Sequence, residues 1–367
     1  MAADTQTQQT VLGNVKDQPE TLRAAFTSRA DFVGPFVEAL RSGPVSRIVF
    51  LGSGTSYNVA TMAASYFSRI AGIDSAAPYP TEFQHYGAGV NTAGTDPSSV
   101  LCVGISQSGT SISTCEALEH AKAKGYRTLA LTSEPGSHIT SLAGVTTPML
   151  VGEELTGPET KGYTVSLMTV YLWAVEAAKT VGALSPDAAS EAVAATERVT
   201  SRFDTVVRES EEWYDRNRPS LLHSSRINIL GYGADYGTML EAVLKVSEML
   251  RVPTIGNLLE EHGHGPTYAL KFDHAHLFIG SDEVEFERML QFREQLGRHA
   301  PGVHAITCRE FDSDERDLVF SVKADRFLAP LMYTVPFQFL AAKGGKDVFI
   351  DTNVNPVPVR LGHYATS

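Results

Sequence analysis

The sequence has few cysteines, no excess of positive charge and no long apolar run. Cys102, Cys115 and Cys308 lie in or next to apolar stretches without metal-type spacing, so we expect reduced packing residues in a cytoplasmic protein. The net charge of −12 disfavours nucleic acid as a partner, because an acidic surface repels its phosphates. No apolar run approaches the roughly 18 residues of a membrane span. The first ten residues are polar, so we also expect no secretory signal.

Strands alternate with helices along most of the 367 residues, a length that suits two domains. This alternation predicts an α/β fold with two tandem domains, each a parallel sheet covered by helices on both faces. Strands are expected at 47–51, 76–79, 101–105, 128–132, 147–151, 227–230, 275–280, 303–307 and 318–322. The predicted parts are a helical segment 1–34, a first domain 35–185, a linking helix 186–217, a second domain 218–346 and a tail 347–367.

The two domains repeat one plan. RIVFLGSGTSYN at 47–58 and RINILGYGADYG at 226–237 each read as a strand, a glycine turn and the start of a helix. We therefore predict an internal duplication. The second copy lacks the hydroxyl residues of the first, so an anion site is expected only in the first domain. The tail after residue 347 has two prolines and is expected to run over the surface or across a partner.

Two turns of the first domain, 52–56 and 106–111, are rich in hydroxyl residues and each joins a strand to a helix. Backbone N–H groups at a helix N-terminus lack internal partners, and serine hydroxyls add donors around the same point. The pair predicts a phosphate site at the carboxyl ends of the strands. Small polar residues in such turns can also serve only as tight turns and N-caps. A dinucleotide site is disfavoured, because GSGTSY lacks the third glycine.

Glu241, Lys245 and Glu248 form a polar stripe on an otherwise apolar helix that follows a strand of the second domain. Such a stripe is commonly a solvated face stabilised by ion pairs. It can instead line a cleft, because carboxylates with perturbed pKa values cluster at functional sites. The sequence leaves both interpretations open.

The stretch 258–268, LLEEHGHGPTY, carries two histidines between glycines, followed by Pro266. Proline excludes a continuous helix, so at least one histidine is expected on an exposed loop. A metal site from Glu260, Glu261, His262 and His264 is disfavoured by its spacing, and we expect no metal or cofactor. A loop without a role is one interpretation. We favour a histidine acid or base, because imidazole titrates near neutral pH.

The chain resembles the sugar isomerase (SIS) family of phosphosugar enzymes, in particular the isomerase half of glutamine:fructose-6-phosphate amidotransferase and the fructosamine-6-phosphate deglycases. The resemblance covers both domains in order. The matching stretches are DQPETL at 17–22, GSGTS at 52–56, SQSGTS at 106–111, ELTGPETKGYT at 154–164, LEAVLKVSE at 240–248, EEHGHGP at 260–266 and YTVPFQFLA at 333–341.

The resemblance implies a role for particular residues. Glu248 would move a proton between C1 and C2, and His264 would assist ring opening or act as an acid. In relatives this histidine reaches the site from a neighbouring subunit, so a homodimer with a shared site is implied. The residues implied to hold the substrate phosphate are Ser56, Ser106, Gln107, Ser108 and Ser111, and the remaining candidate substrate-binding residues are Gly54, Thr55 and Glu159.

Departures from the amidotransferase favour a related substrate. The glutaminase half has no counterpart, so we expect no ammonia production from glutamine. Glu159 replaces the serine before Thr-Lys, Gly263 replaces a lysine, and the near-terminal lysine is missing. We expect a deglycase that acts on a fructosamine 6-phosphate. The alternatives are an aldose/ketose isomerase or aminosugar-6-phosphate deaminase and, from another class, a phosphosugar-binding regulator without activity.

Overall fold

The computed structural model describes residues 9–90, 95–357 and 362–364. The first sheet has five parallel strands, with β1 between β2 and β3, followed by β4 and β5. The second sheet repeats this arrangement, with β6 between β7 and β8, followed by β9 and β10. The predicted α/β class is confirmed. The strands are β1 (Arg47–Leu51), β2 (Ser75–Ala76), β3 (Val100–Ile105), β4 (Arg127–Thr132), β5 (Val145–Pro148), β6 (Arg226–Gly231), β7 (Thr254–Leu258), β8 (His274–Gly280), β9 (Gly302–Thr307) and β10 (Leu318–Val319).

Helices pack between and around the sheets. The longer ones are α1 (Val11–Thr27), α2 (Ala30–Arg41), α3 (Thr55–Tyr66), α5 (Ile112–Ala123), α7 (Lys161–Val181), α8 (Pro186–Ser201), α9 (Phe203–Leu222), α10 (Tyr236–Met249), α12 (Phe286–Gly297) and α14 (Val335–Asp347). The shorter ones are α4 (Pro80–Tyr86), α6 (His138–Leu142), α11 (Leu259–Gly263) and α13 (Pro330–Tyr333). A π-helical turn, η1 (Phe67–Ala71), follows α3, and the 3₁₀ turns are η2 (Pro97–Ser99), η3 (Gly233–Asp235) and η4 (Pro266–Ala269). None of the helices in these described ranges is long and apolar enough to cross a bilayer.

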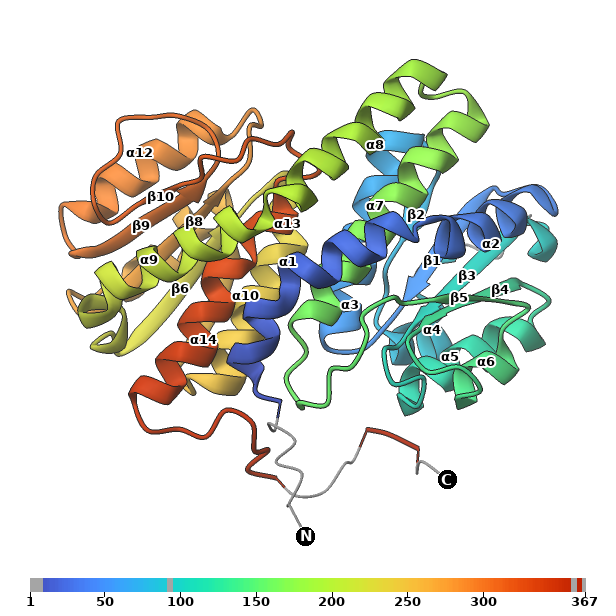
Figure 1. Ribbon diagram of the computed structural model, residues 1–367, viewed down its shortest axis with the longest axis horizontal. Helices are drawn as coiled ribbons and strands as arrows, with labels where there is room; N and C mark the ends of the chain where they lie inside the picture. Colours follow the sequence, from blue (N-terminus) through green and yellow to red (C-terminus); the bar gives the residue numbers. More distant parts are fainter. Residues whose placement is uncertain (1–8, 91–94, 358–361, 365–367) are drawn as a thin grey trace, which may run out of the picture.

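A layer of helices joins the two domains. Figure 1 shows α1, α3, α7, α10 and α14 between the two sheets. One apolar cluster runs through this layer and includes Phe50 on β1 and Ile229 on β6. Helix α7 is buried on nearly all sides, as expected for a helix that is apolar around its circumference. Because the core is continuous, the domains hold each other in a defined orientation.

Several elements differ from the sequence prediction. Strand β7 was not predicted, because Gly256 and Asn257 in a five-residue edge strand resemble a turn, and only pairing with β6 supplies its hydrogen bonds. The predicted linking helix is two helices, α8 and α9, separated at Arg202. Helix α1, within the predicted helical segment, continues through Pro19. The Gln18 side-chain amide donates to the Val15 carbonyl at 2.9 Å, which Pro19 cannot do without an N–H.

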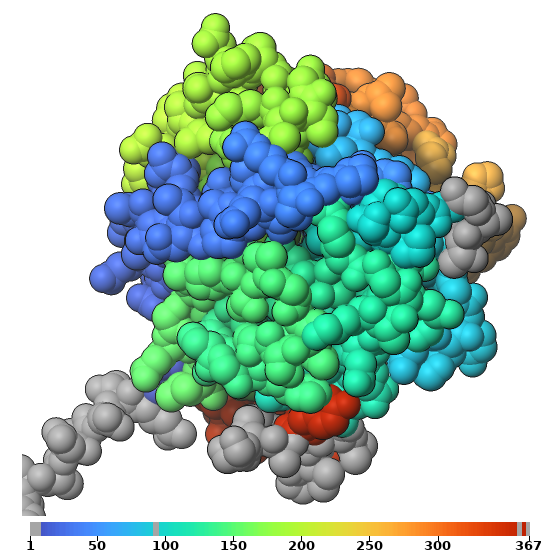
Figure 2. Space-filling view, turned by 90° about the vertical axis from the view of Figure 1, so that its right-hand side faces the viewer, coloured from blue at the N-terminus to red at the C-terminus, as the bar shows by residue number. Residues whose placement is uncertain are grey.

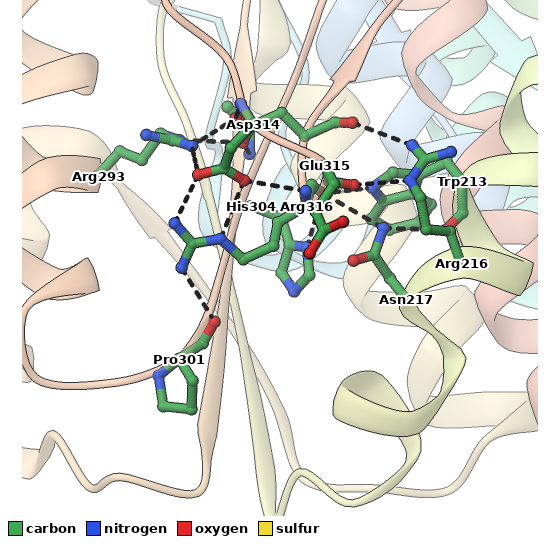
Figure 3. A network of polar contacts seen from close by, with 11 residues as sticks. Trp213, Arg216, Asn217, Arg293, Pro301, His304, Asp314, Glu315 and Arg316 are labelled. Carbon is green, nitrogen blue, oxygen red and sulfur yellow. Dashed lines mark hydrogen bonds and ion pairs between the residues drawn. The ribbon is translucent and has the colours of Figure 1, made fainter.

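A polar network fixes α9 to the second domain (Figure 3). The Arg316 carbonyl accepts a hydrogen bond from Trp213 Nε1 at 2.8 Å, and Arg216 Nε donates to the Glu315 carbonyl at 2.7 Å. Buried Asp317 accepts from Arg293 Nε at 2.9 Å. The helices that lead out of the first domain are thereby anchored on the edge of the second sheet.

The three cysteines are free and buried, as predicted for packing residues. Buried histidines are a further feature of the second sheet. His276 on β8 accepts a hydrogen bond from Asn228 Nδ2 at 3.2 Å through its Nε2. Burial, together with the neighbouring His262 and His274, lowers the pKa of His276 to about 3. The imidazole is therefore neutral in the folded protein at neutral pH.

We expect His276 to make the fold sensitive to acid. Its folded pKa lies below the ordinary 6.5, so its contribution to stability is complete above pH 6.5 and is lost as the pH falls toward the folded value. Between pH 6.5 and 5 this loss should reach about 2 kcal/mol. Thermal unfolding followed across this range should show a smaller decrease in Tm for His276→Gln than for the wild type. The exposed His299→Gln serves as the control, and equal slopes for all three proteins would contradict the assignment.

Candidate functional site

The two hydroxyl-rich loops lie side by side. They follow β1 and β3, which are adjacent parallel strands, so both emerge at the carboxyl edge of the first sheet. Ser53 Oγ forms hydrogen bonds with Ser113 Oγ at 2.9 Å and Thr114 Oγ1 at 3.1 Å, which joins the first loop to the first turn of α5. Each loop leads into a helix, α3 or α5. The structure therefore places two helix N-termini and several hydroxyls at one edge of the sheet, as an anion site requires.

Glycines allow the tight course of both loops. Gly54 has a φ of +59° and Gly109 a φ of +64°, a region that side chains other than glycine rarely adopt. At Gly109 a Cβ would also lie 1.9 Å from Ser137 Oγ. The predicted phosphate-binding residues that are buried at this edge are Ser56, Ser106, Gln107 and Ser111.

Glu154 is a residue of this region that the sequence analysis did not single out. Its Oε1 accepts from the Thr160 N–H at 2.8 Å and the Lys161 N–H at 3.1 Å, at the N-terminus of α7. Its Oε2 accepts from the Gly162 N–H at 2.9 Å and from Gln107 Nε2 at 3.2 Å. The carboxylate thus satisfies the free donors of α7 and holds the side chain of a loop residue. The feature of the sequence that could have identified Glu154 is its position in the stretch ELTGPETK, just before a helix.

The polar stripe of α10 faces the interior. Glu241 is completely buried, although it belongs to the second domain, and its oxygens accept from Asn58 Nδ2 at 2.7 Å and Thr55 Oγ1 at 3.3 Å. Both donors lie on α3, directly after the first hydroxyl loop. The solvated-face interpretation of this stripe is therefore wrong. The reason is that α10 packs against α3 across the domain boundary, which the sequence pattern does not reveal.

Lys245 links two carboxylates. Its Nζ lies 3.6 Å from Glu241 Oε1 and 2.9 Å from Glu248 Oε2. Burial opposes the charge of Lys245, but Glu241 and Glu248 outweigh this effect and raise the pKa of the ammonium group. The Glu248 side chain is 37% exposed, whereas those of Lys245 and Glu241 are exposed by 1% or less. Glu248 is therefore the carboxylate of this group that a ligand can reach.

Glu159 belongs to the same cluster of charges. Burial raises the pKa of its carboxyl group to about 8, the positive charge of Lys245 opposes the shift, and the carboxylates of Glu154, Glu241 and Glu248 add to it. At neutral pH the group is mostly protonated, so it can donate a hydrogen bond. The structure thus brings the predicted residues Thr55, Glu159 and Glu248 together.

The two histidines of the EEHGHGP stretch have different environments. His262 lies in α11 and is buried, whereas His264 follows that helix and is exposed. The expectation that at least one histidine is exposed is confirmed. Within the described part of the chain, no hydrogen bond joins the His264 side chain to Glu248 or Lys245. No group of three or more histidine, cysteine, aspartate or glutamate side chains among the described residues is arranged to hold a metal.

In the second domain, an aspartate side chain lies at the position that corresponds to the first hydroxyl loop. Asp235 follows β6 and Ser281 follows β8, the strands that match β1 and β3. Asp235 accepts from the Ser281 N–H at 2.9 Å and from Ser281 Oγ at 2.8 Å. Burial raises the pKa of Asp235 to about 7, and the two hydrogen bonds from Ser281 counter the shift. A carboxyl group of the second domain itself therefore takes up both donors of Ser281.

Comparison with known proteins agrees with this geometry. Residues 44–176 match the SIS domain family. The first domain of the chain is therefore an SIS domain. A curated relative from Thermococcus kodakarensis, named glutamine–fructose-6-phosphate aminotransferase (isomerizing), is 26% identical to this SIS protein over 337 residues, which are 90% of this chain and 54% of the relative. The chain thus spans about half the length of the curated relatives it matches.

Solved structures show the same fold for this SIS protein. A candidate phosphosugar isomerase from Clostridium difficile 630 is 25% identical, with a TM-score of 0.85 over 96% of this chain and 97% of that chain. A glucosamine-6-phosphate deaminase from Thermotoga maritima is 19% identical, with a TM-score of 0.74 over 95% of this chain and 98% of that chain. The two-domain architecture is therefore shared along nearly the whole length of both structures.

We expect Lys245→Met to destabilise the protein strongly, because it leaves Glu241 buried without a counter-ion. Such a change typically costs about 3–5 kcal/mol. The double variant Glu241→Gln/Lys245→Met removes both charges and should recover a large part of this loss. Urea unfolding of the two variants and the wild type measures the difference. Equal stability of the single and double variants would contradict the proposed pairing.

Proposed function

We propose that this SIS protein is a deglycase that releases a free amine from a fructosamine 6-phosphate. The observation that carries this proposal is the position of Glu248: a half-exposed carboxylate, hydrogen-bonded to buried Lys245, in a cluster that contacts the helix after the first hydroxyl loop. The names of the Thermococcus relative and the Clostridium neighbour support a phosphosugar as the substrate class.

The hydroxyl loops would bind the 6-phosphate. Helix N-termini and serine hydroxyls supply donors suited to phosphate oxygens. The proposed donors are Gly54, Thr55, Ser56, Ser106, Gln107, Ser108 and Ser111. Because the phosphate is the most strongly held part of the substrate, it would fix C1 and C2 of the open chain near Glu248. Positioning of this kind lowers the barrier for proton transfer without new covalent chemistry.

The reaction needs one base, one acid and one water molecule. Glu248 would take a proton from C1 of the open-chain substrate to give a 1,2-enaminol. Return of a proton to C2 would give an aldose imine, and water would cleave its C–N bond to an aldose 6-phosphate and the free amine. Lys245 would hold Glu248 in position through the 2.9 Å contact.

The excess of carboxyl groups supports an amine on the substrate. The carboxyl groups of Glu159, Glu241 and Glu248 all act on the charge of Lys245. A substituted ammonium beside Glu159 would favour its ionised form, because an opposite charge lowers the pKa of a carboxyl group. Glu159 would then bind the amine that distinguishes this substrate from a plain ketose phosphate.

The main alternative is an isomerase or an aminosugar-6-phosphate deaminase, which would share the proton transfer and differ in the fate of nitrogen. The Thermotoga neighbour's name favours it as the second candidate. A screen of N-substituted fructosamine 6-phosphates, fructose 6-phosphate and glucosamine 6-phosphate, with products identified by mass, separates these activities. Binding without turnover on the whole panel would favour a regulator.

A homodimer would complete the site with His264 of a neighbouring copy. His264 is exposed, and within the described part of this chain no hydrogen bond connects its side chain to Glu248. The surface around it carries Tyr268, 95% exposed, and Phe272, 74% exposed, next to edge strand β7. Exposed aromatic side chains beside an unpaired strand edge are typical of a surface covered by another chain.

We expect Glu248→Gln to abolish turnover while binding persists. Loss of a general base typically lowers the rate by about 10²–10⁴-fold. The affinity for fructose 6-phosphate, measured by calorimetry, should change by less than about threefold, because the amide keeps the shape of the side chain. Glu294→Gln on the surface of α12 is the control. Loss of binding together with turnover would indicate a structural role for Glu248 instead.

Mixed dimers test the shared site. Glu248→Gln and His264→Ala chains should each be inactive alone. After unfolding and refolding together, random pairing should restore about 25% of wild-type activity, because half of the dimers are mixed and each of these holds one intact site. No recovery from a dimeric mixture would show that both residues act within one chain.

A further inference from the structure

A short segment near the C-terminus crosses the second hydroxyl loop. The Ile112 N–H donates to the Gly362 carbonyl at 3.0 Å, and the Tyr364 N–H donates to the Thr110 carbonyl at 2.8 Å. Ser111 and His363 form the antiparallel bridge between these two bonds. Figure 2 shows the red C-terminal atoms against the green and teal surface of the first domain. The segment therefore pairs with the backbone of a loop proposed to bind phosphate.

Tyr364 anchors this segment. Its ring lies 4.6 Å from that of His138, centroid to centroid, and it packs beside the apolar cluster that contains Cys115 and Leu118. A hydrogen bond to Glu116 on α5 adds to the effects that raise the pKa of the phenol. The hydrogen bonds on both sides of His363 therefore hold this residue against the loop.

The His363 imidazole faces the loop hydroxyls. Its Nδ1 lies 3.3 Å from Thr110 Oγ1 and 3.5 Å from Ser108 Oγ, and these two hydroxyls are 3.0 Å apart. The loops at 52–56 and 106–111 contain neither lysine nor arginine. A sugar phosphate is mostly a dianion at neutral pH, so hydroxyl and amide donors alone would leave much of its charge unpaired.

We propose that His363 is part of the phosphate site and donates a hydrogen bond from its imidazole to a phosphate oxygen of the substrate. This inference rests on the proposed phosphosugar function. Thr110, beside Ser108, would be a further hydroxyl donor of the same site. The C-terminal segment would then help to select phosphorylated substrates, while Glu248 acts at C1 and C2.

The test separates binding from chemistry. His363→Ala should raise the Kd for fructose 6-phosphate, and the KM of any turned-over substrate, about tenfold, the effect of one charge-assisted hydrogen bond. The kcat should stay within about twofold, because His363 does not reach the reacting carbons. His363→Lys, which places an ammonium donor at this position, should recover most of the affinity. His223→Ala, a histidine outside the site at the end of α9, is the matched control.

Unchanged affinity in His363→Ala, or a lower kcat at unchanged KM, would overturn the proposal. Failure of the proposed deglycase function would give a different set of results from failure of the His363 proposal. If the wild type binds fructose 6-phosphate but releases no amine from any substrate, the deglycase proposal falls while the Kd comparison still decides the role of His363. If the wild type binds neither fructose 6-phosphate nor inorganic phosphate, both proposals are wrong.

Discussion

Glu241 sits where the two domains meet, and the geometry of the candidate site depends on it. The second domain supplies the carboxylate, and Asn58 and Thr55 of the first domain donate hydrogen bonds to it at 2.7 and 3.3 Å. A completely buried carboxylate is tolerated only with such partners, and Lys245 supplies the compensating charge. Since Lys245 also contacts Glu248, the same buried cluster links the two domains and holds the proposed base.

The duplicated fold uses its two copies differently. In each domain a glycine turn after the central strand leads into a helix, α3 or α10. In the first domain the hydroxyl residues at this edge are the proposed phosphate donors, whereas in the second domain both donors of Ser281 bind Asp235. Helix α10 therefore begins beside the hydrogen bonds between Asp235 and Ser281. Its polar stripe reaches α3 of the first domain, at the candidate site. This arrangement explains how two similar domains can build one proposed active site.

Elements with strong local signals could be predicted from the sequence. The apolar run at 47–51 matches β1, and the periodic stretch that contains Glu241 matches α10, because burial on a sheet or against helices requires those patterns. Strand β7 and the division between α8 and α9 could not be predicted, because short edge strands and helix breaks depend on pairing with other parts of the chain. The role of Glu154 could not be predicted for the same reason, because it depends on contact with the N-terminus of α7.

The sequence by itself determined the fold class, the two hydroxyl loops and the residue types available for chemistry, because these follow from periodicity and from the special backbone needs of glycine and serine turns. Only the tertiary structure decided which of these residues meet. It took Glu241 and Lys245 out of solvent, left Glu248 half exposed, and brought His363 to Ser108 and Thr110 across more than 250 residues. Such contacts join distant parts of the chain, so no local pattern can specify them.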